Sequence, residues 1–183
     1  MAVHPDDKEL LFQFKSSETK EKSFTAILKK YQEKLYWHVR RMVVSHDDAN
    51  DVLQNMFIKV WHALDNFRED SQLYTWLYRI ATNECLTFLE QQKRRSSVSL
   101  SDVESGLSNK LKSETGFDAN QLEWKLQIGI QQLPEKQRLV FNLRYYDEMP
   151  YEEMSKILET SEGALKASYH HAAKKIEDFI LNH

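Results

Sequence analysis

From Ser23 to Arg95 the apolar residues recur at steps of three and four almost without a break, which is the spacing of one face of an α-helix. The repeating residues are Phe24, Ile27, Leu28, Tyr31, Leu35 and Val39, then Val52, Met56, Phe57, Val60, Leu64 and Phe67. Ser45–Asp47 interrupts the pattern, and its aspartate supplies a favourable negative charge at the start of the next helix. A third helix is predicted from about Leu73 to Lys93. This half of the chain therefore folds as packed helices.

Composition supports the same fold class. The 183 residues include four glycines and three prolines, and 29% are charged, which suits helices with few tight turns. The single cysteine, Cys85, excludes a disulfide framework within the chain and a cysteine-rich zinc site. No apolar run approaches the roughly 20 residues of a membrane span. Residues 1–10 lack the order of a secretion signal, so we expect a cytoplasmic protein.

Residues 96–120 differ in character from the segments on either side. Seven serines lie between Ser96 and Ser113, and the apolar residues lose their periodicity. Such a composition predicts a flexible linker. We therefore predict an all-α fold in which two small helical domains, residues 23–95 and 121–183, are joined by this linker and preceded by an N-terminal extension, residues 1–22.

The C-terminal domain carries a helix-turn-helix pattern. Helices are predicted over Leu122–Leu133 and Lys136–Tyr145, then from Pro150 to Leu158, and a last one from Ser161, whose side chain suits a helix cap. On the last helix, Leu165, Tyr169, Ala172 and Ile176 share one side, and Gly163, Ala167, His170 and Lys174 share the opposite, slimmer side. A slim helix braced by a short preceding one fits a DNA major groove. An ordinary helical hairpin could give part of this pattern, but the turn length, the cap and the outward face agree with DNA binding.

A second candidate nucleic-acid site is the segment Leu64–Arg79, where a polar loop lies between aromatic residues and arginines. This mixture suits single-stranded nucleic acid, because bases stack on rings and cations meet the backbone. Any one of Phe67, Trp76 and Tyr78 is better explained as core, whereas the polar loop is not explained by packing. The formal net charge of -3 is low for a self-sufficient DNA binder. We expect a larger partner to supply affinity.

The sequence contains no candidate set of catalytic residues, which argues against an enzyme. His170 and His171 are adjacent and point about 100° apart on a helix, so they chelate one metal ion poorly. The aspartates Asp47, Asp48 and Asp51 lack the glycine of a calcium loop. Cys85 stands beside Glu84, which opposes thiolate formation, so a small apolar role is expected. We expect no metal, no cofactor and no small-molecule substrate.

Two segments resemble conserved regions of the extracytoplasmic-function (ECF) sigma factors of bacterial RNA polymerase. Asp48–Phe57, Phe67–Arg68 and Thr75–Asn83 are similar to their region 2, and Leu133–Arg138 through Ser161–Lys166 are similar to their region 4. The resemblance covers roughly residues 23–95 and 122–179 in the family's order. It implies a non-catalytic subunit that binds core RNA polymerase, recognises the −10 and −35 promoter elements and directs transcription initiation.

The resemblance also implies three sets of site residues. Core polymerase is expected to contact Asp51, Gln54, Asn55, Ile58 and Trp61. The −10 element is expected to contact Asn66, Phe67, Arg68, Asp70, Ser71, Tyr74, Trp76, Arg79 and Asn83. The −35 element is expected to contact Arg144, Ser161, Gly163, Ala164, Lys166, Ala167, His170, His171 and Lys174.

This chain departs from the family's pattern. Many members carry threonine, serine and two arginines where this sequence has Ala164, Ala167, Ser168 and His171, and glycine is common where it has Glu69. Fewer cations imply weaker phosphate anchoring and a different base preference. Such factors are often held inactive by a membrane-bound anti-sigma factor, which would keep this protein at the inner face of the membrane.

A different function is a stand-alone helix-turn-helix regulator whose N-terminal module senses a ligand or dimerises. The N-terminal pattern separates the two hypotheses. A sensing or dimerisation module has no need of Asp51, Gln54 and Asn55 off the buried stripe, or of the polar loop at residues 66–71.

Overall fold

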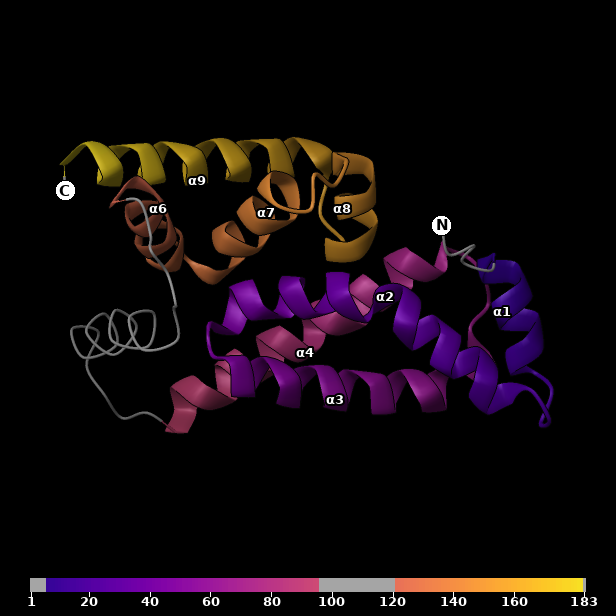
Figure 1. Ribbon diagram of the computed structural model, residues 1–183. Coiled ribbons are helices and arrows are strands. Elements are labelled where there is room, and N and C mark those ends of the chain that lie inside the picture. Colours follow the sequence, from indigo (N-terminus) through magenta and orange to yellow (C-terminus); the bar gives the residue numbers. More distant parts are fainter. Residues whose placement is uncertain (1–5, 96–120, 183) are drawn as a thin grey trace.

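The computed structural model describes residues 6–95 and 121–182, and the regular structure within these ranges is helical (Figure 1). The N-terminal module contains α1 (Asp7–Phe14), α2 (Lys20–Val43), α3 (His46–Ala63), the 3-10 turn η1 (Leu64–Asn66) and α4 (Leu73–Arg95). The C-terminal module contains α6 (Gln121–Gln131), α7 (Glu135–Tyr145), α8 (Tyr151–Leu158) and α9 (Glu162–Asn182). The all-α expectation is confirmed. The predicted linker, residues 96–120, lies outside the described residues.

Helix α1 lies within the segment that the sequence analysis treated only as an extension. Its residues Leu10, Leu11 and Phe14 are buried against the N-terminal module. The ring of Phe14 meets Trp61 edge-on, with centroids 5.4 Å apart, and the Ser23 hydroxyl donates to the Leu10 carbonyl. The spacing of the three apolar residues, one and then three positions apart, is the sequence signal for this helix.

The polar residues that the sequence analysis placed at helix starts act as caps. The Ser45 hydroxyl accepts a hydrogen bond from the Asp48 backbone N–H at 3.3 Å, at the start of α3. The Ser161 hydroxyl accepts one from the Ala164 N–H, also at 3.3 Å, at the start of α9. Pro150 directly precedes α8, where its fixed φ suits helix entry. These caps fix the entry points of the two helices that carry the proposed contacts.

The core of the N-terminal module lies between α2, α3 and α4, which pack pairwise. Leu35 and Val39 of α2, Met56 and Val60 of α3, and Leu77 of α4 have no exposed surface. Of the apolar residues predicted to face inward on α3, Val52, Met56 and Val60 are buried, and Phe57 is half-buried against the core. Within the part of the chain that is described, no helix is both long and apolar enough to cross a membrane.

The two modules pack directly against each other, which the sequence did not predict. Helix α7 lies on α2 and α8 lies on α4, while α3 lies on the far side of the N-terminal module (Figure 1). Buried residues of both modules form one apolar cluster, including Leu35 and Leu77 from the first and Leu143 and Met154 from the second. We call this contact of α2 and α4 with α7, α8 and residues 146–150 the seam.

Candidate polymerase and promoter interfaces

The outer face of α3 presents the residues predicted to bind polymerase. Asp51, Gln54 and Asn55 are exposed, and Ile58 is 53% exposed, unusual for a large apolar side chain. Trp61 differs, because its half-buried ring packs 5.0 Å from Phe24 as well as against α1. The exposed stripe of α3 therefore consists of Asp51, Gln54, Asn55 and Ile58. Trp61 is not part of this stripe, because its ring packs with Phe14 and Phe24.

The loop between η1 and α4 brings together most of the residues predicted to contact the −10 element. Asn66, Arg68 and Asp70 are exposed and Ser71 is half-buried. The half-buried ring of Phe67 lies tilted against Trp76, with centroids 4.9 Å apart. The loop thus offers polar groups beside an aromatic pair, a combination suited to an unpaired base.

The backbone at Glu69 has a conformation that favours glycine, the residue that the family resemblance led us to expect there. Glu69 has a φ of 59°, in the left-handed region that side chains with a Cβ rarely occupy. Such a conformation costs about 1–2 kcal/mol for a non-glycine residue. The Glu69 carboxylate lies 3.8 Å from the Lys15 ammonium, in an exposed ion pair that ties the loop to the segment after α1.

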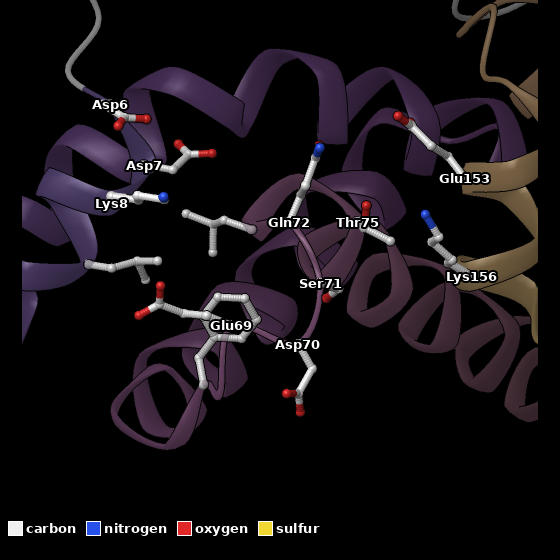
Figure 2. Close-up of a pocket in the computed structure, with 13 residues that line it drawn as sticks. Asp6, Asp7, Lys8, Glu69, Asp70, Ser71, Gln72, Thr75, Glu153 and Lys156 are labelled. Atoms are coloured by element: carbon white, nitrogen blue, oxygen red, sulfur yellow. The ribbon is translucent and has the colours of Figure 1, made fainter.

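A cavity of about 540 Å³ opens beside this loop (Figure 2). Its walls come from three parts of the chain: the start of α1, the loop with the start of α4, and α8. The α8 wall consists of Glu153 and Lys156, which face the loop across the cavity in Figure 2. Five lining residues carry carboxylates and two carry ammonium groups. The C-terminal module thus closes one side of the predicted strand-binding site.

Three predicted −10 contacts, Trp76, Arg79 and Asn83, share one face of α4. Asn83 is exposed. Arg79 is instead engaged by α8, because its guanidinium donates to the Lys156 carbonyl and lies 3.5 Å from the Glu159 carboxylate. In this arrangement Arg79 belongs to the seam.

Tyr74, also a predicted −10 contact, lies apart from the loop residues. Its ring packs 4.5 Å from Tyr78 and 6.4 Å from Tyr31, measured between centroids. Burial raises the pKa of Tyr74 above its ordinary value. The structure therefore places Tyr74 in a tyrosine cluster between α2 and α4.

Helix α9 presents the face predicted for the −35 element. The exposed residues of α9 include Gly163, Ala164, Lys166, Ala167, His170, His171 and Lys174. Leu165, Ala172 and Ile176 are buried on the other side. A Cβ added to Gly163 would meet no atom within 4 Å, so the start of the helix is open on this side. A DNA backbone can approach closely there.

Tyr151 lies between two of the predicted −35 contacts, although the sequence analysis did not include it among them. The Arg144 guanidinium lies 5.2 Å and the Lys166 ammonium 5.5 Å from the centre of its ring, within the range of cation–π attraction. Arg144 also donates to the Met149 carbonyl at 3.2 Å. Tyr151 thus links two predicted −35 contacts from α7 and α9. An aromatic residue directly after the helix-starting Pro150 was the available signal.

Other kinds of site find little support in the described residues. Within residues 6–95 and 121–182, no three His, Cys, Asp or Glu side chains lie close enough to hold a metal ion. Cys85 is fully buried, and burial raises the pKa of its thiol to about 12. A thiol so protonated is a poor nucleophile, in line with the apolar role expected for it.

Comparisons with known proteins agree with both modules. The family model of sigma-70 region 2 matches residues 27–95, and that of sigma-70 region 4 matches residues 126–176. The chain is 34% identical over 171 residues to the ECF RNA polymerase sigma-E factor of Escherichia coli (strain K12), with 87% of each chain covered. It is 33% identical over 164 residues to the RNA polymerase sigma-H factor of Pseudomonas aeruginosa, with 85% of each covered.

Two solved structures share the fold. CnrH, in complex with the cytosolic domain of CnrY, has a TM-score of 0.68 and 21% identity, covering 95% of this chain and 96% of that one. The sigma factor RpoE of Bartonella quintana, in complex with the anti-sigma factor NepR, has a TM-score of 0.67 and 19% identity, covering 87% and 97%.

Region 2 followed by region 4 defines a promoter-specificity subunit of RNA polymerase. The chain belongs to the ECF family of RNA polymerase sigma factors. The stand-alone regulator is therefore not favoured, because a separate sensing module has no place in a chain whose N-terminal half matches region 2.

Proposed function

We propose that this sigma factor binds core RNA polymerase through the exposed stripe of α3, captures the non-template −10 strand with the loop at residues 66–71, and reads the −35 element with α9. The observation that supports this most strongly is the separation of three exposed surfaces on three elements: α3, the loop and α9. Domain limits of 23–95 for region 2 and 121–183 for region 4 belong to the same proposal. The protein itself carries out no catalysis.

Run-off transcription tests this function directly. Purified core polymerase is incubated with a promoter library, with and without this chain, and the transcripts are sequenced. Defined transcript starts that require the chain are expected. If core polymerase produces the same transcripts in its absence, the proposed function is wrong.

The α3 stripe predicts the effect of changing its polar residues. Combining Asp51→Arg with Gln54→Ala reverses one charge and removes one amide on an exposed face, so binding to core polymerase is expected to weaken about tenfold or more. Helicity is expected to be unchanged, since both side chains are exposed. A pull-down titration with core polymerase, alongside circular dichroism, measures both. Wild-type binding by a folded variant would remove the assignment.

Helix α9 predicts different effects for two of its lysines. Lys166 lies near the helix N-terminus and over Tyr151, so Lys166→Ala is expected to change base preference at one −35 position, a loss of about 1–3 kcal/mol of discrimination. Lys174 lies two turns further along, so Lys174→Ala is expected to weaken binding to all sequences and to reduce the salt slope by about 1. Promoter-library selection and salt titration separate the two effects. If Lys166→Ala and His170→Ala both leave the −35 preference unchanged, this face does not read the DNA.

An anti-sigma factor is a further proposed partner. Two structures of the same fold are complexes of this kind by their descriptions, CnrH with CnrY and RpoE with NepR. A cytoplasmic location, with the protein held at the inner face of the membrane by such a partner, follows from this proposal. Co-purification from cells, with the partner identified by mass spectrometry, tests it.

A further inference from the structure

The ammonium group of Lys20 lies where four elements meet, next to the loop proposed to capture the −10 strand. Its Nζ donates a hydrogen bond to Asp65 Oδ2 at 2.6 Å, so the two side chains form an ion pair. The same ammonium lies 4.7 Å from the centre of the Phe14 ring and 5.2 Å from that of Trp61. These four residues, the Lys20 cluster, belong in this order to α2, η1, α1 and α3. One side chain therefore joins four elements beside the start of the loop.

The two rings give this ion pair a fixed place. Phe14 is buried and meets Trp61 edge-on, with centroids 5.4 Å apart, so packing holds both rings. The Lys20 side chain is 27% exposed, whereas that of Lys15, which pairs with Glu69, is 59% exposed. An exposed ion pair contributes little, because water screens it and both side chains lose freedom. The ammonium of Lys20 is shielded on one side, and the ring faces as well as the carboxylate set its position.

Asp65 connects this position to the loop, because Asn66 follows it directly. On the other side of Asp65, Leu64 is buried, and its carbonyl accepts a hydrogen bond from the Phe67 N–H at 3.2 Å. An apolar side chain, a backbone hydrogen bond and an ion pair together hold the turn from which the loop begins. A change at Lys20 therefore reaches the loop through the turn.

The loop is tied to the same segment at a second point. The Glu69 carboxylate lies 3.8 Å from the Lys15 ammonium, and the Glu69 backbone has the φ of 59° described above. A strained backbone persists where its surroundings determine it. The segment at residues 15–20 thus holds the loop at two points. Its two lysines also offset two carboxylates that would otherwise repel a DNA strand.

We propose that Lys20 is a positioning residue for capture of the −10 strand, acting through Asp65 to hold the loop in its binding conformation without touching DNA. The proposal rests on the proposed role of the loop at residues 66–71. Helix α1 takes part through Phe14, whose ring lies against the ammonium. Both Lys20 and α1 lie outside residues 27–95, so the match to region 2 does not assign this role.

The first test removes the ammonium and keeps the packing. Lys20→Met retains an unbranched chain over the two rings, whereas Lys20→Arg keeps the positive charge and can still bond the Asp65 carboxylate. In holoenzyme assembled from core polymerase and the full chain, Lys20→Met is expected to lower open-complex formation about three- to tenfold. Permanganate reactivity of thymines, on a promoter selected in the run-off assay, measures it. Lys20→Arg is expected to restore open-complex formation to within about twofold of the wild type.

The control Lys22→Met removes the same charge from an exposed position of α2 and is expected to melt promoters as the wild type does. Core polymerase binding and the urea midpoint of unfolding are expected to stay close to their wild-type values in all three variants. A loss in Lys20→Arg as large as that in Lys20→Met would contradict the positioning role.

The second test asks whether Lys20 acts through Asp65 or only through its own charge. Asp65→Asn removes the ion pair and also one negative charge beside the proposed strand site. If the pair positions the loop, Asp65→Asn is expected to lower open-complex formation about as far as Lys20→Met does, and the double variant is expected to be no worse than either single one. More open complex with Asp65→Asn than with the wild type would overturn the proposal, because the carboxylate would then act only by repelling DNA.

The outcomes also separate this proposal from the strand-capture role on which it rests. Wild-type melting by a folded Lys20→Met chain overturns the positioning role alone if the triple alanine variant of Asn66, Arg68 and Ser71 has lost melting. Wild-type melting by both variants overturns both proposals. Loss of melting in Lys20→Met, with melting retained in Lys20→Arg and Lys22→Met, supports the positioning role.

Discussion

Changing Asn66, Arg68 and Ser71 together to alanine is expected to lower open-complex formation on duplex promoters about 10- to 100-fold. The three side chains are the polar groups around the Phe67–Trp76 pair, and two of them are exposed. A hydrogen bond contributes about 0.5–1.5 kcal/mol, so losing two or three costs about 1.5–3 kcal/mol, and about 1.4 kcal/mol corresponds to tenfold in an equilibrium constant. Permanganate reactivity of promoter thymines measures the melted fraction.

A matched variant keeps this prediction specific. Lys22, Thr25 and Gln32 are exposed residues of α2 with one cation, one hydroxyl and one amide, the same chemistry as the loop set. Their triple alanine variant is expected to melt promoters as the wild type does. Both variants should retain core polymerase binding. Equal thymine reactivity for the loop variant and the wild type would show that the loop does not capture the strand.

Leu35→Ala is expected to lower the free energy of unfolding by about 2–5 kcal/mol. Leu35 has no exposed surface and belongs to the apolar cluster that both modules share. Truncation leaves a cavity that neighbouring side chains fill only in part. Since a domain's stability is about 5–15 kcal/mol, this single change removes a large fraction of it. Urea unfolding, monitored by circular dichroism, measures the free energy of unfolding of each variant.

The control for Leu35→Ala is a substitution at Phe12 of α1. Phe12 is 78% exposed, so Phe12→Ala removes a larger side chain with little change in burial and is expected to shift stability by no more than about 0.5 kcal/mol. Similar losses for the two variants would contradict the assignment of Leu35 to the core.

The helices that carry the proposed contacts could be predicted because each obeys a local rule. Periodic apolar residues located α3 and α4, and Pro150 and Ser161 located the starts of α8 and α9. The exposed faces of α3 and α9 followed from the same periodicity. Helix α1 was not predicted, because its eight residues give only a weak periodic signal.

The remaining features depend on residues far apart in the chain. Arg41 and Asp147 form an ion pair although 106 positions separate them, and no local pattern marks them as partners. Trp61 was predicted to face polymerase, but its ring packs against Phe14, which belongs to a helix that was not predicted. The packing of Tyr74 likewise depends on Tyr31 of α2. Helical periodicity indicates which side of a helix is buried but not which side chains cover it.

The placement of the α3 stripe and the loop at residues 66–71 on separate surfaces has a kinetic consequence (Figure 1). The proposed docking of core polymerase on α3 is a bimolecular step, so its rate rises with the concentration of core polymerase. The proposed strand capture by the loop is a step within one promoter complex, with a rate that this concentration does not alter. As polymerase becomes abundant, the docking step ceases to limit, and the rate of the proposed strand capture is expected to reach a plateau.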